Sequence, residues 1–180
     1  MKKVLIIYFF FFSLIIYAQE VLLSVDSENY NIFVSSKLQS YDFNEVLDSL
    51  NNGFEAEIFF EFRLYEKATG FLSFLGDKLI IEEKPFYIAG IDIFENTYII
   101  TTHDNEVFSY DTEIEFIKNF FRITSYPIPG SIWEEDKEFY VLARIQLNHV
   151  KLVPPLDLIS LFYSTGFITD WAEIQLNGNK

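Results

Sequence analysis

The chain has 180 residues, half of them hydrophobic and 19% aromatic, and its formal charge is −14 at pH 7. This acidic excess repels nucleic-acid phosphates and anionic lipid headgroups, so we expect neither as a direct partner. There is no cysteine, which excludes disulfides, thiol catalysis, thiolate metal sites and a lipid-anchored lipoprotein. The 21 phenylalanines and 11 tyrosines supply ample material for a core, although an A- and T-rich genome would give the same bias.

The first 20 residues have the layout of a secretory signal peptide. Two lysines precede the apolar run Val4–Tyr17, and Ala18 then stands before a polar pair. A membrane-spanning helix needs about 20 apolar residues, whereas this run supplies fourteen. We therefore predict a signal peptide over 1–18, cleavage between Ala18 and Gln19, and a periplasmic or extracellular protein. An uncleaved N-terminal anchor is the alternative.

Residues 19–180 are predicted to form a single strand-rich exported domain. Removing the two N-terminal lysines leaves 11 basic side chains against 27 acidic ones, so the formal charge falls from −14 to −16. The pattern of elements predicts an α+β fold with a mainly antiparallel β-sheet or sandwich-like core and two or three short helices.

The N-terminal part of this domain is predicted to contain two strands and a helix. The segments Glu20–Asp26 and Tyr30–Leu38 lie on either side of a polar turn, and the second alternates between apolar and polar residues, which indicates a strand pair. Helical spacing follows. We expect Asp42 to cap this helix, Glu45 to complete a capping box and Gly53 to end it.

Residues 54–65 show the clearest strand pattern. The even-numbered residues from Phe54 to Leu64 are all apolar, whereas the odd-numbered ones from Glu55 to Tyr65 are mostly polar. This alternation predicts one packed and one solvated face, as in an antiparallel sheet.

The segment Leu79–Phe94 is predicted to be one long strand. Its apolar residues change phase, and a bulge at Ala89–Gly90 would return both sets to the core. A tight turn at Glu95–Asn96 would then start a hairpin. That hairpin would pair Ile93 with Tyr98 and Ile91 with Ile100.

A further turn at Asp104–Asn105 leads to the predicted strand Val107–Tyr110. Thr112 and Glu115 have the spacing of a capping box and predict a helix through about residue 121. We expect this helix to bury a face made of three residues: Ile114, Ile117 and Phe121.

The C-terminal part begins with a predicted loop, Ser125–Gly130. The alternating segment Phe139–Leu147 then predicts a long strand, with Arg144 among the residues on its solvated side. A short helix is expected between Pro154–Pro155 and Gly166, followed by a final strand over Phe167–Leu176.

This order of elements resembles that of a bacterial family known as domain of unknown function 4390. The resemblance covers most of the chain after the signal peptide and implies an exported, single-domain protein without assigned catalytic or ligand-binding residues. It rests on the following segments: the helix ending at Gly53, the strand Glu57–Tyr65, the aromatic segment Phe71–Leu75, the hairpin about Asn96, the helix near Ile114–Phe121, the strand Arg144–Asn148 with Leu152–Leu156 after it, and the ending Phe167–Trp171.

Few residues suggest chemistry. His103 lies in a predicted turn and His149 at a strand end, without the spacing of a metal site or a catalytic triad, so we interpret both as structural. The acidic residues Glu55, Glu57 and Glu61 share a strand face and suggest a Ca²⁺ site or an acid–base pair. A solvated face that discourages aggregation is the favoured interpretation. No metal or cofactor is expected, and without a glycine-rich phosphate loop or a basic stripe neither is nucleotide or nucleic acid.

The most suggestive segment lies between Gly70 and Gly76. It is either an exposed interaction patch or a turn of helix buried under the sheet. Phe59 and Tyr65, on the predicted solvated face of the strand at residues 54–65, are included in this patch. The candidate interaction patch consists of Phe71, Leu72, Phe74, Leu75, Phe59 and Tyr65.

Three functions follow as hypotheses. The first is a non-catalytic interaction or scaffold module of the cell envelope, which docks through residues 71–75 to an envelope protein or a membrane-proximal partner. The second is a binding protein for a small apolar or lipid-like ligand, held in an aromatic cavity. The third is an envelope hydrolase that uses carboxylates. We expect no enzymatic activity, because no constellation of catalytic residues is visible.

Overall fold

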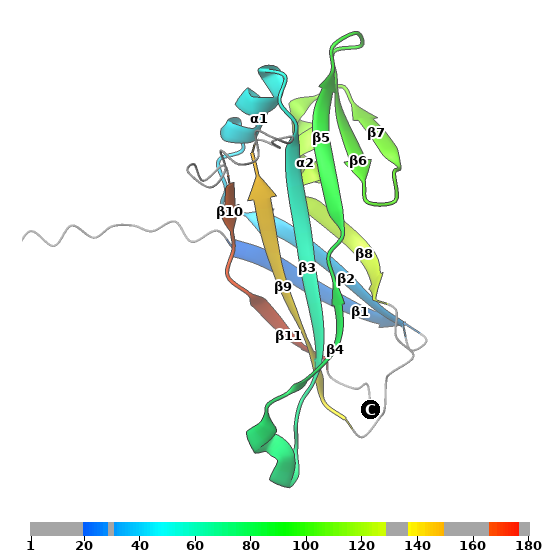
Figure 1. Ribbon diagram of the computed structural model, residues 1–180. Coiled ribbons are helices and arrows are strands. Elements are labelled where there is room, and N and C mark those ends of the chain that lie inside the picture. The colour runs from blue at the N-terminus through cyan, green and yellow to red at the C-terminus, as the bar shows by residue number, and fades with distance from the viewer. Residues whose placement is uncertain (1–19, 29–30, 129–136, 150–165, 177–180) are drawn as a thin grey trace, which may run out of the picture.

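The computed structural model describes residues 20–28, 31–128, 137–149 and 166–176, and its strands form two sheets (Figure 1). The smaller sheet has the order β1-β2-β8, with β1 (Glu20–Glu28), β2 (Asn31–Gln39) and β8 (Arg122–Ile128). The larger sheet has the order β10-β9-β3-β5-β6-β7, while β11 also pairs with β9 and β4 with β3. Its strands are β3 (Ala56–Glu66), β4 (Lys78–Glu83), β5 (Phe86–Asp92), β6 (Thr97–Thr102), β7 (Val107–Tyr110), β9 (Phe139–Asn148), β10 (Gly166–Ile168) and β11 (Ala172–Leu176).

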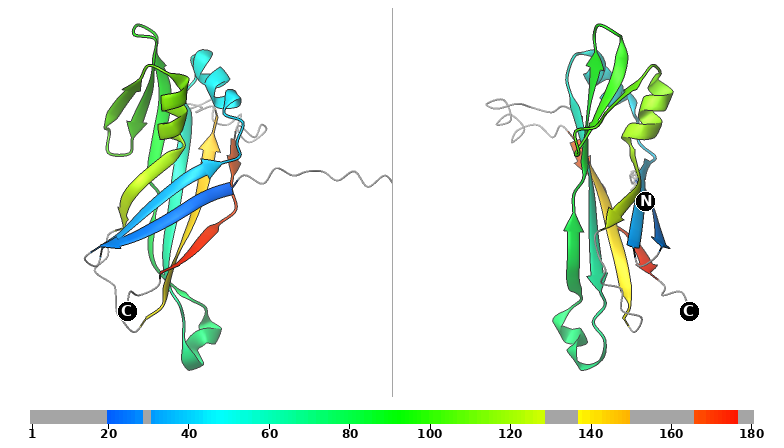
Figure 2. Two further views of the ribbon diagram at one scale, coloured as in Figure 1. Left: turned by 180° about the vertical axis from the view of Figure 1, so that it is seen from behind. Right: turned by 90° about the vertical axis from the view of Figure 1, so that its right-hand side faces the viewer.

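Every described strand pair is antiparallel, which confirms the predicted α+β fold with a sandwich-like core. The smaller sheet crosses one face of the larger one, as the edge-on view shows (Figure 2). Two α-helices, α1 (Asn44–Asn51) and α2 (Glu113–Phe120), pack at one end. A 3-10 helix, η1 (Gly70–Leu75), stands at the other end.

The core between the sheets follows the predicted alternation of β3 and β9. The apolar inward-facing side chains of these two strands are at most 2% exposed. Phe62 on β3 stacks on Tyr126 of β8 with ring centres 5.7 Å apart and so joins the two layers. Phe54 was expected in this set, but it precedes the strand and is 51% exposed. The buried residues are Ala56, Ile58, Phe60, Phe62 and Leu64 of β3 and Phe139, Val141, Ala143, Ile145 and Leu147 of β9.

The start of α1 differs from the predicted capping box. Asp42 Oδ1 accepts hydrogen bonds from the backbone and the side-chain amide of Asn44, two residues on, and therefore forms a local turn. The residue at the helix N-cap is Phe43, which makes no side-chain capping bond. Glu45 accepts instead from the hydroxyl of Tyr41. Gly53 does follow the helix with a φ of +82°, as expected of a terminating glycine.

The segment predicted as one strand is divided into β4 and β5 at Lys84–Pro85. Proline has no N–H for a strand ladder, but the Pro85 carbonyl accepts from the Phe60 N–H at 2.9 Å, so both strands lie along the same side of β3. The predicted bulge is wrong, because the register runs unbroken through Ala89↔Ile100 and Gly90↔Ile99. Phe86 and Ile88 therefore face outward, away from the core.

The β5–β6 turn also differs from the prediction. It contains four residues, 93–96, and not two. Asp92 Oδ1 accepts from the N–H of Phe94 at 2.8 Å and of Glu95 at 3.2 Å, which organises the longer turn. Ile91 consequently pairs with Tyr98 and not with Ile100.

The capping box of α2 is confirmed, since the Thr112 hydroxyl accepts from the Glu115 N–H at 3.3 Å. The buried face is only partly as predicted. Phe116 and Phe120 are buried together with Phe121, whereas Ile114 is 80% exposed. The ring of Phe116 stacks on Phe120 on one side and on Tyr98 on the other. This stack lies on the face of the helix that packs against the core.

The predicted loop at Ser125–Gly130 is wrong over its first four residues, because β8 continues through them and pairs with β2. Ser125 has a φ of +51° and its N–H donates to Ser35 Oγ, so the strand passes through an irregularity. Pro127 is tolerated because β8 is an edge strand of the smaller sheet.

The predicted final strand is present as β10 and β11, interrupted at 169–171. The signal peptide, the cleavage position and the helix after Pro154–Pro155 lie outside the described residues. Within the described ranges, none of the helices has the length and apolar character needed to cross a membrane.

The α2 packing gives a direct test by two substitutions on one helix. Phe116→Ala removes a fully buried ring and is expected to lower the free energy of unfolding by about 3–5 kcal/mol. Ile114→Ala, on the exposed face, is expected to change it by at most about 0.5 kcal/mol. Urea unfolding of both variants checks the assignment, and equal losses would contradict the observed helix orientation.

Candidate functional site

The loop between β3 and β4 presents a short 3-10 helix, η1, beyond the end of the sheets (Figures 1 and 2). Gly70 begins it and Gly76 follows it, with φ values of +66° and +83°. Residues with a Cβ rarely adopt this left-handed region, so both glycines are required by the backbone. They turn the chain out of β3 and back into β4.

Two phenylalanines project from this tip. Phe71 is 90% exposed and Phe74 is 71% exposed, and their rings meet edge to face with centres 5.8 Å apart. The alternative of a turn buried under the sheet is therefore wrong for these two residues. Leu72 and Leu75 belong to the same helix, but their side chains lie outside what the structure describes. We call Phe71 and Phe74 the apolar tip.

The base of the tip is tied to the sheet through Asp77. Its carboxylate accepts from the Ala68 N–H and from the Tyr140 hydroxyl, each at 2.9 Å. The hydrogen bond from Ala68, followed by that from Tyr140, lowers the pKa of Asp77. Burial, followed by the bond to Asp77, raises the pKa of Tyr140 to about 12. The tip is thus held in place although its rings are in solvent.

The other two members of the predicted patch lie on the outer face of β3 and not on the tip. Tyr65 stacks on Tyr140 with ring centres 5.2 Å apart and planes 8° from parallel, so it belongs to the base of the hairpin. Phe59 precedes Tyr65 by six residues in β3, which places it roughly 20 Å from Tyr65 along the strand. It packs against Phe86 and beneath the ammonium of Lys84.

The same outer face carries an ion network that the sequence did not reveal. Glu61 is 5% exposed. One of its carboxylate oxygens lies 2.7 Å from Arg144, and the other lies 2.8 Å from Arg63. The indole of Trp171, from the β10–β11 connection, lies against both guanidinium groups at 4.4 and 4.7 Å.

This network corrects the interpretation of the carboxylates as a solvated row at Glu61 alone, since Glu55 is exposed and precedes β3. Glu61 is buried and neutralised by two cations, so it has no oxygen free for a Ca²⁺ ion or for proton transfer. Glu57 receives only a long contact of 3.4 Å from Asn148. Alternation places Glu61, Arg63 and Arg144 on one side of their strands, but only the β3–β9 register shows that they meet.

A second cluster forms where α1 approaches the end of β9. The Tyr41 hydroxyl lies 2.6 Å from Nε2 of His149 and 3.2 Å from Glu45, whose carboxylate also lies 3.4 Å from Nδ1 of His149. Burial is the main cause that raises the pKa of Tyr41 and lowers that of His149. Phe167 packs on Tyr41 at 4.9 Å. These residues line an open cavity of about 760 Å³.

His103, the other predicted structural histidine, pairs with the adjacent Asp104 at 3.2 Å. Across the described ranges, no group of three or more histidine or acidic side chains is arranged to hold a metal ion.

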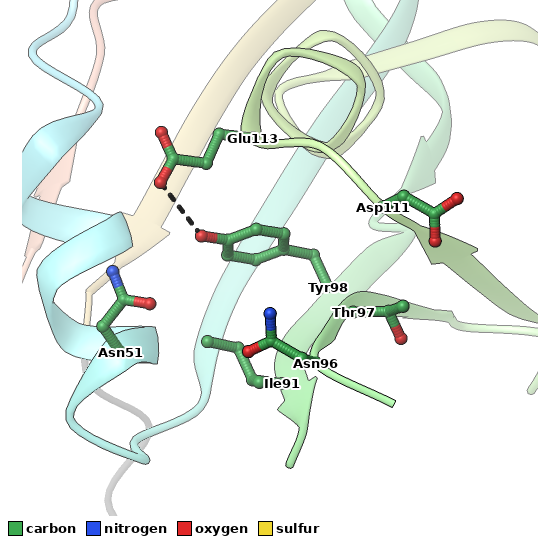
Figure 3. Close-up of a pocket in the computed structure, with 7 residues that line it drawn as sticks. All are labelled: Asn51, Ile91, Asn96, Thr97, Tyr98, Asp111 and Glu113. Carbon is green, nitrogen blue, oxygen red and sulfur yellow. Dashed lines mark hydrogen bonds between the residues drawn. The ribbon is translucent and has the colours of Figure 1, made fainter. Parts of the chain in front are cut away.

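A smaller pocket of about 210 Å³ lies between the end of α1, the β5–β6 hairpin and the start of α2 (Figure 3). Its lining is mainly polar. The Tyr98 hydroxyl donates to Glu113 across one side at 3.2 Å. The lining residues are Asn51, Ile91, Asn96, Thr97, Tyr98, Asp111 and Glu113.

No protein-family model, curated protein or solved structure matches the chain. The resemblance to domain of unknown function 4390 therefore stays a prediction.

The ion network on β3 is expected to contribute to stability. Glu61→Gln leaves two partly buried guanidinium groups without their carboxylate, so the free energy of unfolding should fall by about 1–3 kcal/mol. Glu82→Gln, which removes a more exposed partner of Arg63, should cost less than about 1 kcal/mol. Denaturant unfolding of the two variants measures the difference. A Glu61→Gln protein as stable as wild type would contradict the assigned role.

The buried imidazole of His149 predicts a pH dependence of stability. Because its pKa is lowered on folding, the unfolded chain takes up the proton more readily, and acid favours unfolding. The stabilising contribution is complete above the ordinary histidine pKa of about 6.5 and is lost as the pH falls through the lower folded value. Unfolding at pH 7 and pH 5 should show a smaller loss for His149→Gln than for wild type. Equal losses would show that His149 titrates normally.

Proposed function

We propose that the protein is a non-catalytic interaction module of the cell envelope that docks on a partner protein through the apolar tip. The observation that supports this proposal is a pair of solvent-exposed phenylalanines on a turn that two glycines direct away from the sheet. Single exposed apolar side chains are ordinary, but exposed rings that contact one another form a contiguous patch, and such patches often mark contact sites. Aromatic residues also dominate the binding energy of protein interfaces.

A protein partner fits the tip better than a lipid surface. The base of the tip carries Glu66 and Asp77 beside Lys67 and Lys78, so it offers no cationic ring for anionic headgroups. The chain as a whole has a formal charge of −14, which repels an anionic membrane. Two rings form a small anchor of the kind that fills a pocket in another protein.

The proposal is tested by photo-crosslinking in intact cells. A photoreactive phenylalanine analogue at position 74 is expected to form an adduct with a distinct protein, and Phe71→Ser in the same chain should abolish that adduct. The matched control carries the analogue at Leu22, which is 54% exposed on β1, and should not give the same product. Phe71→Ser should also lower the affinity of the non-covalent complex with the identified partner by at least tenfold.

Folding of the variant is checked separately, because an exposed ring contributes little to stability. Phe71→Ser should leave the free energy of unfolding within about 0.5 kcal/mol of wild type. A lipid adduct from position 74, or an adduct that persists in Phe71→Ser, would contradict a protein partner at the tip.

A second candidate function is the binding of a small apolar or lipid-like ligand. The cavity beside Tyr41 and Phe167 supports it, because its volume of about 760 Å³ is within the range of ligand sites. The aromatic walls suit an apolar body, while His149 and Glu45 offer polar contacts at one side.

Native mass spectrometry of the exported chain tests this alternative. A bound ligand should appear as a defined mass increment that is lost in Phe167→Ala, whereas Phe71→Ser should retain it. A spectrum that shows only the unliganded mass would remove the support for this function. The carboxylate-hydrolase hypothesis receives no such support from the geometry, because both Glu61 oxygens are engaged by arginine.

A further inference from the structure

The end of the molecule opposite the apolar tip is acidic. Residues 85–117, which form the β5–β6 hairpin, β7 and most of α2, contain no lysine or arginine. We call this region the acidic lobe. It carries seven acidic side chains: Asp92, Glu95, Asp104, Glu106, Asp111, Glu113 and Glu115.

The acidic lobe ends in an open strand edge. β7 pairs with β6 on one side, and no described strand pairs with its other side (Figure 1). The Thr102 N–H donates to the Glu106 carbonyl at 2.9 Å. Hydrogen-bonded pairs alternate along an antiparallel ladder, so the N–H and C=O groups of Val107 and Ser109 point away from β6. These groups form a template for an added strand.

This edge lacks several of the features that prevent strand addition, although β7 is only four residues long. Proteins protect edges with lysine, proline or bulges, whereas β7 has the sequence VFSY and a regular register with β6. Its apolar side chains are also accessible. Val107 is 63% exposed and Phe108 is 45% exposed.

Charge determines which strand fits. An extended segment beside β7 would run past Glu106 at one end and Asp111 at the other. Asp111 also lines the polar pocket of about 210 Å³ with Glu113 and Asn96 (Figure 3). A lysine ammonium reaching that pocket would meet carboxylate and amide oxygens. A second copy of this chain is disfavoured, since it would bring its own acidic residues against these.

We propose that the free edge of β7 binds an extended peptide segment of a partner protein, with alternating apolar residues and flanking lysines or arginines, by β-strand addition. Main-chain hydrogen bonds to Val107 and Ser109 provide the pairing. Val107 and Phe108 contact the apolar residues, and the acidic lobe selects for basic flanks. This site is independent of the apolar tip.

The experiment measures binding of a fluorescent peptide to the full chain by fluorescence anisotropy. The peptide has eight residues of alternating valine and threonine, flanked by two lysines at each end. Two comparison peptides replace lysine by glutamate, or carry N-methyl groups on alternate backbone amides. We expect the lysine peptide to bind and the methylated and glutamate peptides to bind at least tenfold more weakly. Raising the salt from 0.05 to 0.5 M should also weaken binding.

Protein variants locate the binding. Val107→Pro removes an outward N–H without touching the β6 ladder and should reduce affinity about tenfold. The double variant Glu106→Lys with Asp111→Lys should reverse the preference toward the glutamate peptide. The matched control, Asp26→Lys with Asp48→Lys, changes the net charge equally on other elements and should retain the lysine preference.

The outcomes are distinct from those for the apolar tip. Phe71→Ser should bind the lysine peptide as wild type does, whatever the result of photo-crosslinking. The proposal is overturned if the methylated and unmethylated peptides bind equally. This comparison uses the wild-type chain, so it remains decisive even if Val107→Pro fails to fold. Concentration-dependent dimerisation that Val107→Pro abolishes would overturn it in favour of a second copy at this edge.

Discussion

The antiparallel pairing of β3 with β9 sets the position of every surface described above. The register runs through ten residue pairs, from Glu57↔Asn148 to Glu66↔Phe139, without a break. It places Phe60 beside Ile145 on the inner face and Glu61 beside Arg144 on the outer face. A slip of one residue would turn the phenylalanines to solvent and bury charge without a partner. Packing on one face and the ion network on the other therefore specify the same register.

This central pair also determines how the two ends of the molecule differ. β3 continues past the sheets into the hairpin that carries the apolar tip, and Tyr140 of β9 holds the base of that hairpin through Asp77. At the other end the larger sheet widens through β5, β6 and β7 into the acidic lobe (Figure 1). Both surfaces are fixed to one continuous sheet. Two ligands bound there would be held at a defined spacing, which is the arrangement that a scaffold requires.

The sequence predicted those parts of the fold whose pattern repeats locally. Alternation in β3 and β9 identified the core residues, and Thr112 with Glu115 identified the start of α2. Errors arose where pairing between distant segments decides the outcome. The β5–β6 turn is an exception, because Asp92 accepts from the N–H groups two and three residues on. This is a local signal of an aspartate turn, and the register of Ile91 follows from it. The phase of α2, by contrast, was set by the aromatic stack of Phe116 on Tyr98.

The candidate sites show the same division. The apolar character and flanking glycines of residues 70–76 were visible in the sequence, but the exposure of Phe71 was not. The joining of Glu61, Arg63 and Arg144 with Trp171 depends on two strands, β3 and β9, and a connection that meet only in the folded protein. The open edge of β7 is a property of strand order, which periodicity does not encode.

Composition alone does not account for the apolar tip. A codon bias toward A and T would enrich phenylalanine over the whole surface, and exposed rings do occur elsewhere, at Phe94 and Phe54. The same bias disfavours glycine, whose codons begin with two guanines, and the chain has only seven. Two of these seven begin and follow η1 with positive φ values that other residues adopt at a cost of about 1 kcal/mol. Such a bias would account for the phenylalanines but not for the glycines whose positive φ values project them, so the backbone of this turn is the feature that composition leaves unexplained.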